Sequence, residues 1–243
     1  MPLIDLHCHT GFTAETLALG APDAAAARAY ADQYGVEALC FSAALSASDL
    51  CGGTADLVGF LAADARFRGW LTLSTHQTEL SGELARKYLV KPSFCGAFIE
   101  QSTDADVVTT AGGREVLNAL RRYSRPVMLS VSSPATLDAA IHAAREFSTL
   151  KFIISPQDEY LTQVAAPAMK EAVNSVFLPV AAYAERDVIA MAVAILGERR
   201  VAWGSNWGRF VPAAALGMIR DSALTGPQRE RVGLRNAREL LSS

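Results

Sequence analysis

Short apolar segments recur along nearly the whole chain, and segments with the period of amphipathic helices separate them. The eight strand candidates are residues 2–9, 36–43, 67–75, 94–101, 126–131, 150–156, 175–182 and 200–206. Between two of them, Leu137, Ile141 and Ala144 form the apolar face of a helix, and His142 lies on its polar face. Eight alternating units in 243 residues predict an α/β fold: a single (β/α)8 barrel of the TIM type, regular or distorted, over residues 1–243.

The rival architecture is a doubly wound open sheet. That fold favours a glycine-rich turn after its first strand, and the stretch HCHTGFTAE offers only Gly11. No linker or low-complexity stretch divides the chain. The single barrel domain is therefore the better prediction.

Charge and cysteine content restrict the partners and the compartment. The net charge is −3, from 22 basic and 25 acidic residues without a basic block, which argues against nucleic acid and anionic membranes as partners. No apolar run reaches the roughly 18 residues of a membrane span, and Asp5 and His7 interrupt any N-terminal signal segment. The four cysteines form no CxxC pair, which suits a reducing compartment. We expect a cytoplasmic protein that takes a small-molecule substrate; homo-oligomerisation stays open.

The carboxyl ends of the strands build the active site in barrels of this type. The residues expected there are His7, His9, Ser42, residues 74–76, Glu100, Gln101, Ser130, Ser132, residues 155–157, Tyr183 and residues 205–207. Few of them are charged, and serine is frequent.

Two histidines stand one residue apart at the end of the first strand. Because side chains alternate along a strand, His7 and His9 should both face the barrel interior, with Cys8 facing the helices. Two imidazoles can chelate one divalent ion, but a catalytic zinc normally takes three protein ligands. The alternative is a hydrogen-bonded pair of histidines without metal.

Both ends of the chain resemble one family. The stretch IDLHCHTG resembles the first-strand signature of the amidohydrolase superfamily, and RVAWGSNWGRF, with Asn236 and Ala237 further on, resembles the end of its amidohydrolase-related branch. The resemblance implies a mononuclear or binuclear metal centre in a barrel. Its ligands would be the HxH pair, a Lys or Glu on the fourth strand, histidines ending the fifth and sixth strands, and an Asp ending the eighth.

The chain keeps only part of that ligand set. His7 and His9 match, and Glu100 matches the fourth-strand ligand. Ser130 stands at the end of the fifth strand, Ser155 and Gln157 at the end of the sixth, and Asn206 where the Asp is expected. An amide cannot take a proton from water near neutral pH. We therefore expect one weakly held divalent ion, with zinc first, on His7, His9 and Glu100, or no metal at all.

Three functional hypotheses follow from the resemblance. The first is a divergent enzyme that hydrolyses a lactone, amide or ester bond of a small polar molecule, with weak or no metal dependence. Its candidate catalytic residues are His7, His9, Asn206 and His76, and its candidate substrate-binding residues are Ser130, Ser155, Gln157 and Trp207. The second is a lyase or decarboxylase. The third is a catalytically silent barrel that binds a small ligand or a protein partner.

Overall fold

Seven parallel strands form one sheet in the computed structural model, which describes residues 1–11, 22–101, 108–157, 159–179 and 187–242. In this part of the chain the strands pair in sequence order from β1 to β7. They are β1 (Leu3–Thr10), β2 (Val36–Ala43), β3 (Phe67–Thr72), β4 (Phe94–Gln101), β5 (Val127–Val131), β6 (Phe152–Pro156) and β7 (Ser175–Phe177). Strict sequence order with parallel pairing is the topology of a (β/α)8 barrel and excludes the doubly wound sheet.

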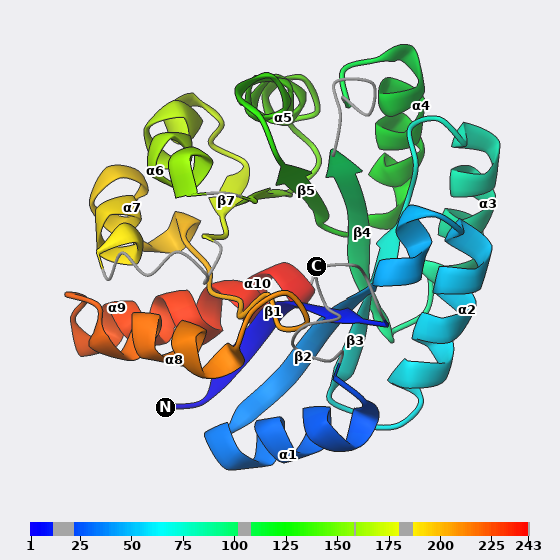
Figure 1. The fold of residues 1–243 in the computed structure, drawn as a ribbon. Helices are drawn as coiled ribbons and strands as arrows, with labels where there is room; N and C mark the ends of the chain where they lie inside the picture. The colour runs from blue at the N-terminus through cyan, green and yellow to red at the C-terminus, as the bar shows by residue number, and fades with distance from the viewer. Residues whose placement is uncertain (12–21, 102–107, 158, 180–186, 243) are drawn as a thin grey trace.

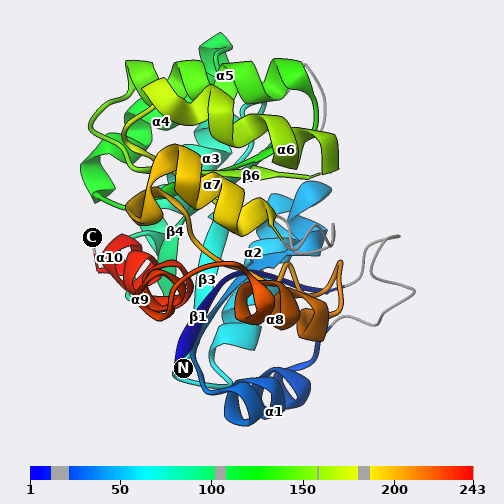
Figure 2. The same ribbon diagram turned by 90° about the vertical axis from the view of Figure 1, so that its left-hand side faces the viewer.

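Helices connect the strands and form an outer layer around them (Figure 1, Figure 2). They are α1 (Ala24–Tyr34), α2 (Leu50–Leu61), α3 (Thr78–Tyr88), α4 (Ala111–Leu120), α5 (Pro134–Glu146), α6 (Glu159–Ala168), α7 (Val188–Leu196), α8 (Pro212–Asp221), α9 (Gly226–Glu230) and α10 (Asn236–Leu241). Helix α5 has the predicted faces: Leu137 and Ala144 are buried and His142 is exposed. No helix in the described ranges is long and apolar enough to cross a membrane.

The eighth strand candidate, residues 200–206, is not a regular strand. It is an extended segment that hydrogen-bonds to both neighbours: Ala202 N donates to Phe177 O at 2.9 Å, and Asn206 N donates to His7 O at 2.8 Å. Isolated bridges join Phe177 to Val201 and Cys8 to Trp207. The predicted barrel is therefore confirmed in its distorted form, with an irregular segment between β7 and β1.

Backbone geometry explains why this segment leaves the regular ladder. A Cβ on Gly204 would lie 3.0 Å from His7 N, so a side chain at this position would press against the backbone of β1. Asn206 has a φ of 52°, and Gly208 has a φ of 102°. Positive φ angles turn the chain out of the strand and fold it back over the first strand.

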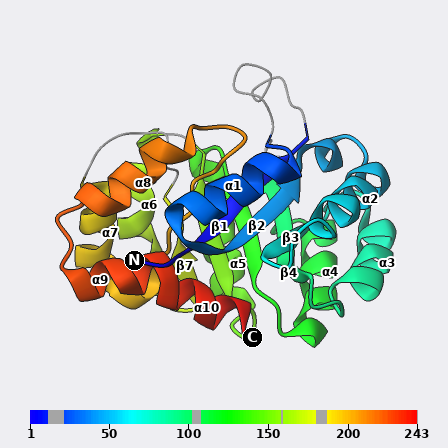
Figure 3. The same ribbon diagram turned by 90° about the horizontal axis from the view of Figure 1, so that it is seen from below.

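The apolar core has two layers. Inside the barrel, Leu6, Trp70, Phe98 and Met128 belong to one buried cluster. Leu240 of α10 joins it, and Figure 3 shows α9 and α10 at the end of the barrel where the N-terminus lies. A larger cluster lies between the strands and the surrounding helices. Apolar side chains thus fill the barrel interior at the amino ends of the strands, and polar side chains concentrate at the carboxyl ends.

A register shift in β1 directs the two histidines inward. The pairing of β1 with β2 is irregular between Asp5 and Cys8. Leu6 lies in the interior cluster and Cys8 in the cluster on the helix side. The ring of His7 lies 4.5 Å from that of His9 and 5.3 Å from that of Phe98, so both imidazoles lie over the inner core.

Candidate functional site

Four polar side chains form a continuous hydrogen-bond chain at the carboxyl ends of the strands. Ser42 Oγ lies 3.3 Å from His7 Nε2 and 3.0 Å from His9 Nδ1. His9 Nε2 in turn lies 2.6 Å from Asn206 Oδ1. All four residues are buried. Ser42 holds its place because the register of β1 and β2 pairs it directly with His9.

The acceptor at one end of this chain sets the direction of every bond in it. With the Asn206 amide in this orientation, Oδ1 can only accept, so His9 Nε2 carries the proton. His9 Nδ1 then holds a lone pair and accepts the Ser42 hydroxyl proton. His7 Nε2–H completes the chain by donating to Ser42 Oγ. A serine hydroxyl therefore points at the basic nitrogen of a neutral imidazole.

A buried carboxylate anchors the backbone beneath the histidines. Asp5 Oδ1 accepts from Ser205 N at 2.8 Å and from His7 N at 3.4 Å, and Oδ2 accepts from the Tyr30 hydroxyl at 3.3 Å. Burial raises the pKa of Asp5 to about 6. Because Asp5 ties β1 to the irregular eighth segment, its role is to position His7 and Asn206.

The turn after the eighth segment closes over His9. Asn206 O accepts from Arg209 N and Phe210 N at 3.1 and 3.2 Å. A Cβ on Gly208 would lie 2.8 Å from His9 Cβ and 3.0 Å from His9 O. The glycine thus lets the turn lie directly on β1, and the turn carries Arg209 to the mouth of the barrel.

Arg209 connects β4 to the residue that follows β6 across this mouth. Its Nη2 donates to Glu100 Oε1 at 3.0 Å, and its Nη1 donates to Gln157 Oε1 at 2.6 Å. The side chains of Arg209 and Glu100 are 19% and 27% exposed. The ion pair is therefore partly shielded from water, which strengthens it relative to a surface pair.

Burial and the nearby cation keep both imidazoles neutral. Burial, with a smaller contribution from the Arg209 charge, lowers the pKa of His9 to about 3. Burial also lowers the pKa of His7 well below its usual value, and the charges of His9 and Arg209 act in the same direction. At neutral pH both rings are therefore able to accept a proton.

Two small cavities open onto this site. One, of about 70 Å³, is lined by His9, Ser42, Ala43, Ala44, Ala47, Thr72, Phe98, Glu100 and Arg209. The second, of about 100 Å³, is polar and includes Ser74 and Gln77 in its lining. The cavities share Ala47, Thr72 and Glu100, so they adjoin. The buried hydroxyl of Thr72 has no hydrogen-bond partner within the described residues, and a bound molecule could supply one.

The side chains at this mouth do not fit a metal centre. Among the residues that the structure describes, no group of three or more His, Cys, Asp or Glu side chains could hold a metal ion. Glu100, expected as the third ligand beside His7 and His9, pairs with Arg209 instead. The Arg209 charge, which already disfavours protonation of both histidines, would also disfavour a second cation.

The structure brings together some of the predicted site residues and separates others. His7, His9 and Asn206 converge, and Gln157 reaches them through Arg209. Ser155 is linked to this group only through Gln157, because its carbonyl oxygen accepts from Gln157 Nε2 at 3.0 Å.

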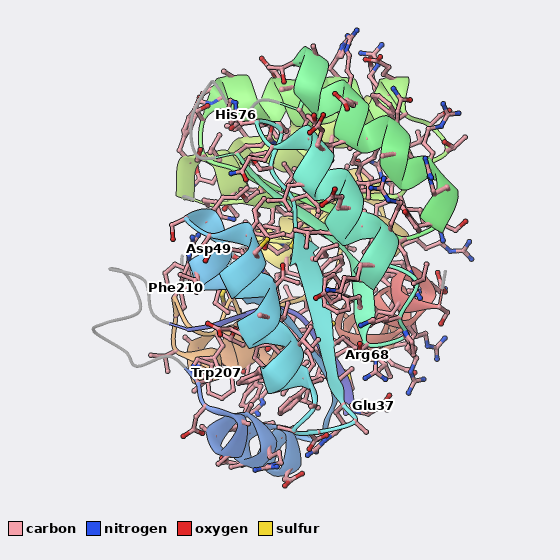
Figure 4. All side chains as sticks on the ribbon, turned by 90° about the vertical axis from the view of Figure 1, so that its right-hand side faces the viewer. Glu37, Asp49, Arg68, His76, Trp207 and Phe210 are labelled. Atoms are coloured by element: carbon pink, nitrogen blue, oxygen red, sulfur yellow. The ribbon has the colours of Figure 1, made fainter. Side chains whose placement is uncertain are left out.

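Three other predicted residues have different surroundings. Ser130 Oγ accepts from Gln101 N at 3.2 Å. Trp207 packs against the ring of Tyr30 from α1 at 5.0 Å. His76 is exposed in the loop after β3, and Figure 4 shows it far from Trp207. Tyr183 lies outside the described residues.

Two residues of the site were not identified as site residues from the sequence. Arg209 carries no signal of its own, because a single arginine after a strand is common on protein surfaces. Ser42 was placed at a strand end, but its contact with both histidines depends on the register between β1 and β2.

Comparison with known proteins agrees with this fold. The Amidohydrolase family profile matches residues 4–242, so the chain belongs to the amidohydrolase superfamily, as its two ends predicted. A comparison with curated proteins found no match.

Several solved structures share the fold at low identity. The 5-carboxyvanillate decarboxylase of Novosphingobium aromaticivorans, complexed with manganese and 4-hydroxy-3-methoxy-5-nitrobenzoic acid, is 12% identical, with a TM-score of 0.76 over 100% of this chain and 96% of the other. The 2,6-dihydroxybenzoate decarboxylase from Rhizobium is 14% identical, with a TM-score of 0.72 over 99% and 98%. A Pseudomonas putida protein provisionally assigned as a 2-pyrone-4,6-dicarboxylic acid hydrolase is 17% identical, with a TM-score of 0.68 over 99% and 97%. At least one protein of this fold thus binds manganese.

Proposed function

We propose that the protein is an enzyme that hydrolyses an ester or lactone bond of a small polar molecule and does not need a divalent metal for the chemical step. The observation that carries this proposal is the chain Ser42–His9–Asn206, which directs a hydroxyl at a neutral imidazole. Acyl transfer needs a group that accepts a proton as the nucleophile attacks and returns it to the leaving oxygen.

His9 fits both halves of that role. Its low pKa makes it a weak base, but it also makes the imidazolium a strong acid toward the leaving oxygen. Asn206 Oδ1 accepts from the opposite nitrogen and stabilises the imidazolium once it has formed. Arg209 lines the same cavity and supplies positive charge for a developing oxyanion.

The cavities indicate a small polar substrate. Their volumes of about 70 and 100 Å³ leave room for a short acyl group and a compact leaving group. A guanidinium pairs well with a carboxylate, so a substrate carboxylate could replace Glu100 on Arg209. The structural neighbours are named for acids with rings, which supports a small cyclic carboxylate or its lactone.

Decarboxylation is the second candidate. Its support is that two of these neighbours are described as decarboxylases. It would place the substrate carboxylate beside Arg209 and a ring carbon beside the histidines, which occupy the same mouth of the barrel.

One activity screen separates these possibilities. Protein treated with a chelator is assayed with 4-nitrophenyl acetate, with simple aryl lactones and with dihydroxybenzoates, before and after addition of Mn²⁺ or Zn²⁺. We expect hydrolysis whose rate the chelator does not change. We also expect it to fall about 100-fold or more in His9→Gln, because general base catalysis is lost.

The control is His142→Gln on the exposed face of α5, which should keep the parental rate. Release of carbon dioxide from the dihydroxybenzoates only with added metal would favour the decarboxylase instead. No turnover of any compound would favour a barrel that only binds.

A further inference from the structure

We propose that Ser42 is a catalytic nucleophile and forms a covalent acyl-enzyme through the hydroxyl that it donates to His9. This inference rests on the proposed hydrolytic function and assigns the attacking atom to the protein and not to a water molecule. Its basis is the single hydrogen-bond chain that joins a serine, an imidazole and an amide.

The geometry is that of an activated serine. Ser42 Oγ lies 3.0 Å from His9 Nδ1, and His9 Nε2 lies 2.6 Å from Asn206 Oδ1. A nucleophile, a base in hydrogen-bond reach and a third group that orients the base are the requirements for nucleophilic catalysis, and an amide serves as the third group in cysteine proteases of the papain type. Here the serine faces Nδ1 and the amide faces Nε2, which exchanges the two ring nitrogens without changing their roles.

The surroundings of Ser42 allow a carbonyl group to reach it. Ser42 is only 1% exposed to bulk solvent, yet it lines the cavity of about 70 Å³. The lining of the same cavity includes the guanidinium of Arg209 and the hydroxyl of Thr72, which has no hydrogen-bond partner among the described residues. A carbonyl oxygen in this cavity would find hydrogen-bond donors.

The reaction balances with the groups present. Ser42 Oγ attacks the carbonyl carbon while its proton moves to His9 Nδ1. The bond to the leaving oxygen then breaks, and that oxygen takes the proton from His9. Water attacks the acyl-serine in the second half and gives its proton to His9, which returns it to Ser42 Oγ as the acid leaves. No oxidant, metal or co-substrate other than water takes part.

A purely structural serine would also bridge two histidines, so the test must detect a covalent bond. The full-length protein is incubated with phenylmethanesulfonyl fluoride, which forms an S–O bond to an activated serine and loses fluoride. It is incubated separately with 4-nitrophenyl acetate and quenched in acid. Peptide mass spectrometry then locates the sulfonyl or acetyl group. Mapping on the unaltered protein needs no variant to fold.

Three variants accompany the mapping. Ser42→Ala should lose the adduct and slow ester hydrolysis by about 1,000-fold or more. Asn206→Ala should slow the rate of sulfonylation by about 10- to 100-fold, because the imidazole loses its orienting partner. The control is Ser175→Ala: Ser175 is equally buried at the start of β7, its hydroxyl bonds to Ala172 O and Arg200, and the variant should leave labelling unchanged.

The outcomes separate this inference from the function on which it rests. A modified Ser42 in the unaltered protein, absent in Ser42→Ala and present in Ser175→Ala, supports it. Hydrolysis without an adduct, or with an adduct on another residue, overturns the nucleophile but leaves the hydrolase intact, with His9 activating water. Neither adduct nor hydrolysis overturns both.

Discussion

His9 Nε2 and Asn206 Oδ1 lie 2.6 Å apart although 197 residues separate them in the sequence. This contact joins the first strand to the irregular segment that occupies the eighth-strand position. An aspartate there would bring a negative charge to a pair of neutral imidazoles, whereas the amide brings none. The charged side chains at the mouth of the barrel are instead Arg209 and Glu100, which pair with each other.

Asn206→Asp tests whether Asn206 stands at a position that can still bind a metal or belongs to a site that works without one. The carboxylate should raise the pKa of His9 and cost about 1–3 kcal/mol of stability at neutral pH, because a buried charge replaces a buried amide. Zinc should not raise the melting temperature of the variant. Thermal melts with and without zinc measure this, and Asn206→Ala is the control. A strong stabilisation by zinc in Asn206→Asp alone would show that a metal site persists.

The stability of the protein should fall as the pH drops from about 6.5 to about 3. The folded protein keeps His9 neutral down to a pKa of about 3, but the unfolded chain protonates it near 6.5. On acidification the unfolded chain therefore binds a proton at His9 before the folded protein does. The contribution of neutral His9 to the free energy of unfolding is complete above pH 6.5 and is lost at about 1.4 kcal/mol per pH unit between pH 6.5 and pH 3. Urea unfolding at pH 7, 6, 5 and 4, followed by tryptophan fluorescence, measures it.

The contribution of Asp5 to stability has the opposite pH dependence, so Asp5 provides the matched control. Its pKa of about 6 in the folded protein exceeds the usual 3.8, so the folded state binds more protons between these values. Acidification through that window partly offsets the loss from His9. Asp5→Asn removes the offset and should lose about 2 kcal/mol more than the parent protein between pH 7 and pH 4. A smaller loss of stability on acidification in Asp5→Asn than in the parent protein would contradict the raised pKa of Asp5.

The ion pair of Arg209 and Glu100 should show measurable coupling. Arg209→Met leaves a half-buried carboxylate without its cation, and Glu100→Gln leaves the guanidinium without its anion. Each single variant should lose about 1–3 kcal/mol of unfolding free energy, and the double variant should lose less than their sum. A double-mutant cycle in urea gives the coupling. Strict additivity would mean that solvent already screens the pair.

Gly208→Ala tests the turn that seats Arg209. The new Cβ would lie 2.8 Å from His9 Cβ, and the φ of 102° is strained for any side chain. We expect a loss of about 2 kcal/mol or more and a slower hydrolysis rate. Gly59→Ala on the exposed face of α2 is the control, because nothing lies within 4 Å of its added Cβ. It should be neutral or stabilising by up to about 1 kcal/mol. Equal effects at both positions would contradict the role of the turn.

The sequence was most informative where a local pattern determines structure. Alternating apolar and helical periods predicted the barrel. The prediction that His7 and His9 face inward with Cys8 opposite is also met, but through the irregularity of β1 between Asp5 and Cys8, because Leu6 faces inward as well. The irregular eighth segment could not be predicted, because the positive φ of Asn206 results from tertiary contacts with β1. The partner of Glu100 was missed for the same reason: Arg209 reaches it across 109 residues of sequence.

The protonation of His9 is the property on which the whole account depends, and nitrogen-15 NMR of the labelled imidazole measures it directly. At pH 7 we predict a proton on Nε2, bonded to Asn206, and an unprotonated Nδ1 that accepts from Ser42. Addition of Zn²⁺ or Mn²⁺ should leave both signals in place. A proton on Nδ1, together with a Nε2 resonance that shifts or broadens when metal is added, would show that His9 is a metal ligand and would contradict the account.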